Sequence, residues 1–394
     1  MQQFDVLVVG AGPAGSTAAL NVAPLRRVAL VEARAETTRR IGESLPPIAR
    51  RLLRDMGLLD SFLAQAHSPY YGNRSSWGSS QWSESDFLRD PDGHGWHLDR
   101  ARFEAWLCRI AVERGAALFA PARLEEIERH GDSWKVLLAT ETGAVSIAAD
   151  IVIDATGRGA NVARRLGASR RTKDRLVCGW VCQETTCELV SEASEHRGKG
   201  AGFTHIWATG EGWWYTAPIP GNRRMLAFHT DSDLPAARLA TNPSALLANV
   251  PASGEFAEIL GRMSSLKIGK TNAEHGVTPA SSSVLQPCAG PGWFAAGDAA
   301  MTFDPLSGQG LLNALFTGLA AAEAADRQLQ DCEDALPGYL QTLAGIETAY
   351  RRHLSEWYQA ETRWPGSRFW ERRRCAKIGR SAMEFRSRRR HPRE

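Results

Sequence analysis

The chain has 394 residues and a net charge of only +3, which suggests two or three structural units around a sizeable core. No apolar run reaches the ~18 residues that span a bilayer, and no basic segment followed by an apolar stretch opens the chain, so neither a membrane span nor a secretory signal is expected. Seven scattered cysteines, an odd number without zinc-ligand spacing, favour a reducing, cytoplasmic compartment and no metal site.

The first predicted element is a buried parallel strand that leads into a glycine-rich turn. Residues 6–9 form a short apolar run, and Gly10, Gly12 and Gly15 follow as G-x-G-x-x-G. The first glycine permits a tight turn, the second lets the backbone approach a pyrophosphate, and the third lets the next helix pack closely. With Ala14 in the first turn of that helix, the pattern predicts a dinucleotide phosphate site.

A second predicted strand, residues 28–31, ends at Glu32, roughly twenty residues after the glycines, where a carboxylate accepts ribose hydroxyls and disfavours a 2′-phosphate. Arg40 and Glu43 then lie in the segment RIGES, just before an amphipathic helix. Arg100 lies in the first turn of another predicted helix, from which it could reach back to the pyrophosphate. Segments that open helices suit contacts with an anion or a flavin.

The second half of the predicted site lies almost three hundred residues later. A strand at 293–296 ends at Asp298, whose carboxylate suits ribityl hydroxyls. The segment DPLSGQG, with Pro305, Gly308 and Gly310, then enters an Ala/Leu-rich helix at Leu311. A glycine-rich helix start places N–H groups where negative charge develops on a reduced flavin ring. The first motif alone predicts a dinucleotide, whereas the pair predicts FAD and a chain that returns to complete its first sheet.

Between these motifs, residues 172–290 have a different texture. Short alternating runs at 176–182, 202–208, 213–220 and 225–229 predict an antiparallel sheet with one buried face. Trp213 and Trp214 are adjacent within it, so their side chains must face opposite sides of the strand. We therefore expect at least one of them to face the flavin or the substrate, with ordinary aromatic packing as the alternative.

The C-terminal segment is strongly basic. Residues 363–394 carry twelve Arg or Lys side chains against three glutamates. Such a tail can bind an acidic protein partner, or it can be a solvated segment without a partner. No nucleic-acid-binding motif accompanies it, so nucleic acid is not expected.

The motifs GAGPAG, IGES, LDRARF, DATG and GDAAMTFDPLSGQG resemble those of FAD-dependent monooxygenases with the p-hydroxybenzoate-hydroxylase fold. Within them, the chain resembles the branch that holds geranylgeranyl reductases, flavin-dependent tryptophan halogenases and the flavoproteins of tryptophylquinone cofactor biogenesis. The resemblance implies a role in FAD binding for most of the residues singled out above: Gly10, Gly12, Ala14, Gly15, Glu32, Arg40, Glu43, Arg100, Asp298, Pro305, Gly308, Gly310 and Leu311.

The implied fold class is α/β. A Rossmann-like FAD-binding domain would comprise residues 1–171 and 285–330, with an antiparallel-sheet substrate domain inserted at 172–284. A helical segment with the basic tail would follow at 331–394.

The chain departs from the tryptophan halogenases at three places. Their W-x-W-x-I-P signature is not reproduced around Trp213 and Trp214. They carry active halogen on a lysine in the N-terminal part, whereas the first lysine here is Lys135. They also place a glutamate just after Pro-Leu, where this chain has Ser307. These departures favour oxygen transfer, with Trp213, Trp214 and Ser307 as candidate catalytic residues.

The strand WWYTAPIP resembles most the tryptophylquinone-biogenesis flavoproteins. That resemblance implies a monooxygenase that hydroxylates an indole, as a tryptophan in a peptide or small protein, through a C4a-hydroperoxyflavin. His97, His205 and His229 are candidates for moving protons. Electrons would come from NAD(P)H directly or through a separate reductase. The alternatives are a halogenase, hydroxylase or reductase of a small natural product, and a non-catalytic FAD scaffold for an acidic partner.

Overall fold

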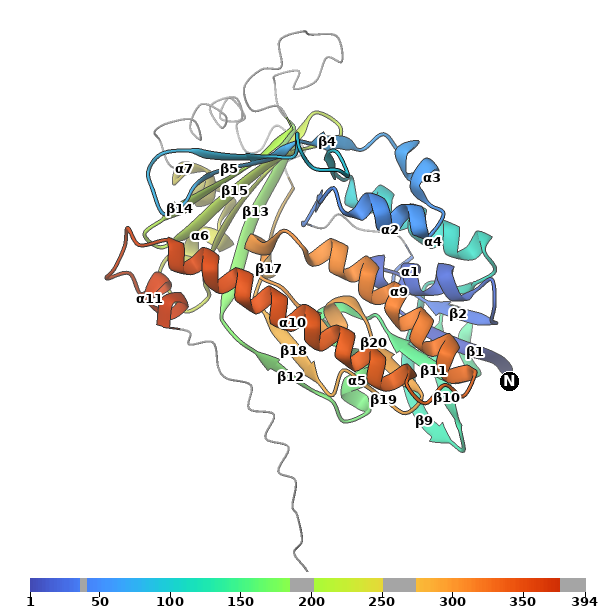
Figure 1. Cartoon of the computed structure of the whole chain (residues 1–394). Helices are drawn as coiled ribbons and strands as arrows, with labels where there is room; N and C mark the ends of the chain where they lie inside the picture. The colour runs from blue at the N-terminus through green and yellow to red at the C-terminus, as the bar shows by residue number, and fades with distance from the viewer. Residues whose placement is uncertain (36–40, 185–201, 251–273, 376–394) are drawn as a thin grey trace, which may run out of the picture.

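The structure is a computed structural model that describes residues 1–35, 41–184, 202–250 and 274–375. Two large sheets dominate it, and helices pack around them (Figure 1). In the described part of the chain, no helix is long and apolar enough to cross a membrane.

The first sheet has a parallel centre and is built from both ends of the chain. Its order is β19 (Ala289–Gly290), β20 (Trp293–Ala295), β11 (Gly143–Asp154), β1 (Gln2–Val9), β2 (Val28–Val31) and β8 (Ala117–Phe119). An antiparallel extension on β11 adds β10 (Ser133–Thr140) and β9 (Ala122–His130). The apolar runs at 6–9 and 28–31 are buried, as parallel central strands require. The chain thus returns to its first sheet at β20, as predicted.

The second sheet is mostly antiparallel and joins strands from three parts of the chain. Its order is β17 (Glu274–Pro279), β13 (Leu176–Glu184), β16 (Arg223–Asp231), β15 (Gly212–Ile219), β14 (Phe203–Thr209), β5 (Gly72–Ser76) and β6 (Ser83–Asp86). The four alternating runs predicted from the sequence are β13 to β16. Two further strands, β5 and β6, come from before residue 172, and β14 pairs with β5 in parallel. The sheet therefore includes strands from outside the predicted 172–284 segment.

Two small sheets connect the large ones. One comprises β12 (Ser169–Thr172), β18 (Ser283–Gln286) and β21 (Met301–Thr302). The other comprises β3 (Ser44–Leu45), β7 (Gly95–His97) and β4 (Ser68–Tyr70). Because β3 begins at Ser44, within the RIGES segment, the small sheet of β3, β7 and β4 holds that segment near the large antiparallel sheet.

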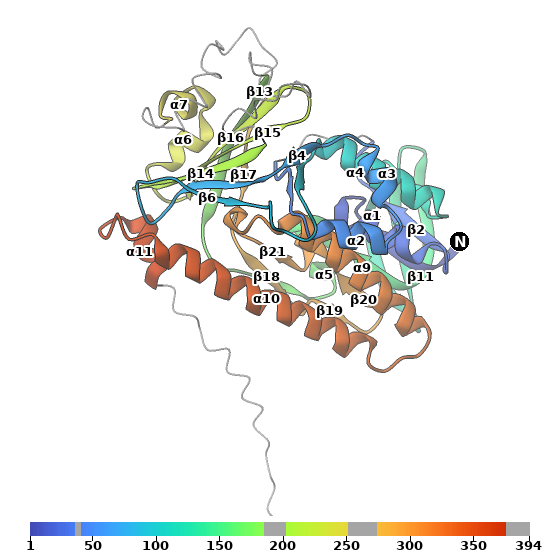
Figure 2. The same cartoon turned by 45° about the horizontal axis from the view of Figure 1, so that its top comes forward.

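The helices divide into three groups. Those around the first sheet are α1 (Pro13–Val22), α2 (Ala49–Asp55), α3 (Leu59–Leu63), α4 (Arg100–Glu113), α5 (Asn161–Arg165) and α9 (Gly310–Leu329). Against the second sheet pack α6 (Ala237–Thr241) and α7 (Pro243–Ala248). The third group is α10 (Ala335–Ala360) and α11 (Arg368–Cys375). In both views the long helix α10 packs beside α9 (Figures 1 and 2). The chain continues from α10 into α11, which lies near the second sheet.

Candidate functional site

The glycine loop at the end of β1 is shaped by backbone contact. Gly10 has φ +103°, and a Cβ there would collide with the carbonyl of Ala155 in the DATG turn. A Cβ on Gly15 would collide with the carbonyl oxygen of Gly10. Only glycine fits either position, because α1 and the loop lie in direct contact. The predicted strand, turn and helix are therefore present, with the close packing that the pattern indicates.

The N-terminus of α1 is open to an anion. Its first turn holds no acidic residue, and Gly12 makes no side-chain cap. The Oε2 atom of Glu32 accepts a hydrogen bond from the Ala11 N–H (2.9 Å), and its Oε1 accepts one from Arg34 (3.1 Å). Uncapped N–H groups at the positive end of a helix are the donors that a pyrophosphate requires. The residues at this end fit FAD, and the ribose role of Glu32 stays a prediction.

The two predicted halves of the site meet at α1 and α9. A Cβ on Gly318 of α9 would collide with the carbonyl oxygen of Ala14 in α1. A Cβ on Gly297 would lie 2.7 Å from the Ala14 Cβ, and the Gly297 N–H donates to Thr317 Oγ1 (2.8 Å). Both the segment after β20 and α9 thus pack directly against α1 beside the glycine loop.

Asp298 lies on the short 3₁₀ helix η2 (Gly297–Ala299) between two arginines that the sequence reasoning did not single out. The Arg158 side chain lies 3.6 Å from the Asp298 carboxylate. The half-buried Arg170 donates a hydrogen bond to the Asp298 backbone carbonyl (2.9 Å). The Asp298 carboxylate is 40% exposed. It therefore keeps lone pairs for a ligand hydroxyl, which is what the predicted ribityl contact needs.

Asp154, in the DATG motif, organises the turn beside the glycine loop. It is fully buried, and its two carboxylate oxygens accept hydrogen bonds from the N–H groups of Thr156, Val162 and Ala163 (2.8–3.0 Å). It thereby satisfies two N–H groups in the first turn of α5 and holds the turn that leads into η1 (Gly157–Gly159). The position at the end of a buried strand was a signal for this role.

The turn at residues 41–44 is held from the side of α4. The Arg100 guanidinium donates to the carbonyl of Gly42 (2.6 Å) and pairs with Glu104. Glu43 is buried and accepts a hydrogen bond from Gly42 (2.9 Å). Arg100 therefore contacts the turn directly, and its reach to a pyrophosphate stays a prediction. Arg40 lies outside the described residues.

The loop before α9 provides the second open helix end. Gly308 has φ +62° with open space around its Cα, and α9 begins at Gly310 without a side-chain cap or an acidic residue in its first turn. Pro305 is exposed, while Leu311 is buried. The Ser307 hydroxyl donates to the carbonyl of Asp304 (2.9 Å), so it shapes the loop. A catalytic role for Ser307 stays a prediction.

Asp304, at the start of the short 3₁₀ helix η3 (Pro305–Ser307), is a buried carboxyl group that the sequence reasoning missed. It accepts hydrogen bonds from the Tyr358 hydroxyl (2.7 Å) and the Leu306 N–H (2.9 Å). Burial, and then the nearby charge of Asp174, raise its pKa to about 7. Such a group can change charge under physiological conditions.

Trp213 and Trp214 face opposite sides of β15, as predicted. Trp213 is buried with Tyr358, Phe369 and Trp370 of the C-terminal helices. Trp214 packs with Phe228 and the α6–α7 side. Leu306, of the loop before α9, packs against the Trp213 cluster. Trp213 thus lies on the face toward the predicted flavin loop.

The three candidate histidines are buried and neutral. Burial lowers the pKa of His97, His205 and His229 to about 3 in each case. The His229 ring stacks on Trp213, with centroids 3.6 Å apart and planes 6° apart. A buried imidazole with so low a pKa carries no charge near neutral pH and is a poor store for a proton.

Part of the basic C-terminal segment is bound within the chain. Arg372 and Arg373 both pair with Asp231 at the end of β16 (2.8 and 2.7 Å). Trp370 is buried, and its indole N–H donates to the Thr209 carbonyl (2.8 Å). We call Tyr358 and α11 the C-terminal clamp, because they close the Trp213 face of the second sheet. The predicted basic tail beyond residue 375 lies outside the described residues.

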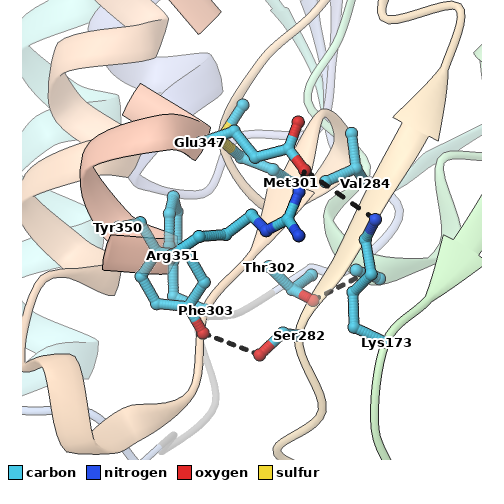
Figure 3. A pocket seen from close by; sticks show the side chains of 10 residues that line it. Lys173, Ser282, Val284, Met301, Thr302, Phe303, Glu347, Tyr350 and Arg351 are labelled. Atoms are coloured by element: carbon cyan, nitrogen blue, oxygen red, sulfur yellow. Dashed lines mark hydrogen bonds and ion pairs between the residues drawn. The ribbon is translucent and has the colours of Figure 1, made fainter. Parts of the chain in front are cut away.

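A small cavity lies between β18, β21 and α10 (Figure 3). Tyr350 borders it, and the Tyr350 and Ser282 hydroxyls lie 2.6 Å apart. Lys173 and Glu347 form an ion pair at 3.8 Å across its rim. The cavity volume of ≈ 20 Å³ suits a water molecule, and an indole does not fit. Within the described residues, no cluster of His, Cys, Asp and Glu could hold a metal ion.

Comparison with known proteins identifies the family. Residues 3–316 match the FAD binding domain family. The chain belongs to this family. It is an FAD-dependent oxidoreductase of the halogenase and monooxygenase type, and its predicted cofactor FAD and its fold class are confirmed.

Three relatives place the chain more finely. It is 28% identical to the FAD-dependent oxidoreductase LodB of Marinomonas mediterranea over 378 residues, covering 95% of this chain and 97% of LodB. The flavin-dependent halogenase CmlS has a TM-score of 0.79 at 25% identity, covering 95% of this chain and 68% of CmlS. QhpG, a peptidyl tryptophan dihydroxylase essential for tryptophylquinone cofactor biogenesis, has a TM-score of 0.72 at 24% identity, covering 94% and 78%. The predicted resemblance to halogenases and tryptophylquinone flavoproteins is confirmed.

Proposed function

We propose that this protein is a monooxygenase that hydroxylates the indole of a tryptophan held in a peptide or small protein, during biogenesis of a tryptophylquinone cofactor. The observation that carries the proposal is Ser307. In the segment that enters α9, Ser307 occupies the position at which tryptophan halogenases have a glutamate. Its hydroxyl donates a hydrogen bond to the Asp304 carbonyl (2.9 Å). The likeness to QhpG supports the same choice.

The chain's own groups suit oxygen transfer to an aromatic ring. Bound FAD, once reduced, supplies the activation of oxygen. The aromatic cluster on the Trp213 face would exclude water from one side of the site, because Trp213 and Trp370 are buried among aromatic side chains. Electron supply, by NAD(P)H or by a separate reductase, stays a prediction.

A second candidate function is halogenation or hydroxylation of a small natural product. The observation that favours it is the likeness to CmlS, which has a higher TM-score than QhpG at a similar identity. A non-catalytic FAD scaffold is a third candidate, and turnover of reduced flavin separates it from the other two.

The test is mass spectrometry of a tryptophan-containing peptide after incubation with the protein, reduced flavin, isotope-labelled oxygen and bromide. We expect one or two labelled oxygen atoms on the tryptophan and no bromine. The matched control is the same peptide with Phe in place of Trp, which should remain unmodified. Bromination of the indole would favour the halogenase candidate, and peroxide without any oxygenated peptide would refute the monooxygenase.

A further inference from the structure

Tyr215 connects the second sheet with the turn at residues 41–44. It lies on β15, and its hydroxyl donates a hydrogen bond to Glu43 Oε1 (2.6 Å). The same hydroxyl lies 3.1 Å from Ser44 Oγ, which in turn lies 3.3 Å from His97 Nδ1. A strand of the second sheet and a predicted flavin-side turn therefore share one hydrogen-bond network.

The alternation of side chains along β15 places Tyr215 on the same face as Trp213. Tyr215 comes two residues after Trp213, so both side chains lie on the same face of β15. Ser44 and His97 are directly paired residues of β3 and β7, which fixes their separation. A displacement of β15 at Trp213 would therefore also move Tyr215, two residues along the strand, and with it the hydrogen bond to Glu43.

The charge states keep the network in one arrangement. Burial, then the negative charge of Glu43, raise the pKa of Tyr215 well above its ordinary value, so the phenol remains a donor. Burial and the charge of Arg224 lower the pKa of His97 to about 3, so the imidazole is neutral. A donor hydroxyl facing a carboxylate is among the stronger hydrogen bonds available to a protein.

The turn is also restrained from its other side. Arg100 donates to the carbonyl of Gly42, and the Gly42 N–H donates to Glu43 Oε2 (2.9 Å). Glu43 and Arg100 border a cavity of ≈ 10 Å³, about the room that one water needs, together with Ile219 and Met225 of the second sheet. With Arg100 on one side, Tyr215 is the contact that ties the Glu43 carboxylate to the sheet.

We propose that Tyr215 is a positioning residue that holds the Glu43 carboxylate for the flavin and couples the Trp213 face of β15 to the flavin site. The inference deepens the proposed function and rests on the predicted flavin role of Glu43. It requires that loss of the Tyr215 hydroxyl have no further consequence once the Glu43 carboxylate is absent, because the hydroxyl acts through its hydrogen bond to that carboxylate.

The test is a double-mutant cycle of Tyr215→Phe and Glu43→Ala, read by FAD affinity and by the visible absorption spectrum of bound FAD, without substrate. We expect each single variant to weaken FAD binding about tenfold. The double variant should bind FAD as tightly as the single variant that binds it less well. The spectral change should also be shared by all three variants, which a merely structural role would not produce.

Tyr70→Phe is the matched control. The Tyr70 hydroxyl donates to Asn73 (2.6 Å), and its ring also lies against His97, with centroids 4.6 Å apart. This variant should leave the spectrum unchanged. Independent, multiplicative losses in the cycle, or an unchanged FAD affinity in Tyr215→Phe, would overturn the coupling. If Tyr215→Phe does not fold, a cycle of Glu43→Ala with Ser44→Ala tests the same network. Because no substrate is used, failure of the peptide assay does not affect this result.

Discussion

Trp213 and Trp214 are neighbours in the chain but belong to different hydrophobic clusters. The alternation of a β-strand makes this separation certain from sequence, whereas the identity of each cluster is set by tertiary contacts. Trp213 meets Trp370, which lies 157 residues later, and no local pattern indicates that pairing. The direction in which a side chain points was thus predictable, and its partner was not.

Asp304 gives a pH dependence that can be measured. Its folded pKa of about 7 lies above the ordinary value of 3.8, so the folded protein retains a proton that the unfolded chain has lost. Its contribution to stability is complete below pH 4 and is lost as the pH rises through 7, with a slope of up to ~1.4 kcal/mol per pH unit.

We expect Asp304→Asn to remove this slope. Urea unfolding of both proteins between pH 4.5 and 8 measures it: the stability of the wild type relative to the variant should fall until pH 7 and then level off. Parallel curves across the whole range would show that Asp304 ionises normally in the folded protein.

At the scale of elements, the decisive contact is between α1 and α9. Gly318 of α9 lies against the Ala14 carbonyl without room for a Cβ. We expect Gly318→Ala to separate the helices, to cost about 1–3 kcal/mol and to weaken FAD retention, because the N-terminus of α1 moves with the helix.

Gly345→Ala is the matched control for that substitution. Gly345 lies within α10, and a Cβ there meets nothing within 4 Å. This variant should be more stable than the wild type by ~0.5–1 kcal/mol, since alanine loses less backbone entropy in a helix. Thermal unfolding and FAD fluorescence measure both variants, and equal effects at the two glycines would contradict the packing argument.

The C-terminal clamp is an element-scale feature that depends on a buried ion pair. Asp231 is 2% exposed and Arg373 is 8% exposed, so removing the carboxylate leaves a buried guanidinium without its partner. We expect Asp231→Asn to cost about 3–5 kcal/mol and to expose α11 to trypsin.

The exposed pair of Arg327 and Asp334 is the comparison, since its side chains are 52% and 71% exposed. Asp334→Asn should change the free energy of unfolding by less than ~1 kcal/mol. A similar cost at Asp231 and Asp334 would mean that the clamp contributes little to stability.

Across the whole molecule, the sequence predicted those strands, turns and helices that a motif within a few neighbouring residues specifies. Glycine spacing, strand alternation and strand-terminal carboxylates predicted β1–α1–β2, the return at β20 and the strands β13 to β16. The return at β20 was predictable because a second glycine-rich motif marks it, whereas no motif marks the pairing of β5 with β14 or the clamp on Asp231. Arg158 and Arg170 were not predicted, since an arginine that contacts a distant segment has no local signature.

The contact between Ala14 and Gly318 also has a consequence for the order in which the protein matures. The ribosome completes the glycine loop and α1 early, but the surface that packs against α1 is made only after more than three hundred residues have been synthesised. A nascent chain that stops before α9 therefore leaves the α1 surface at Ala14 uncovered. We expect stable retention of the cofactor only after α9 has been synthesised, when most of the polypeptide has left the ribosome.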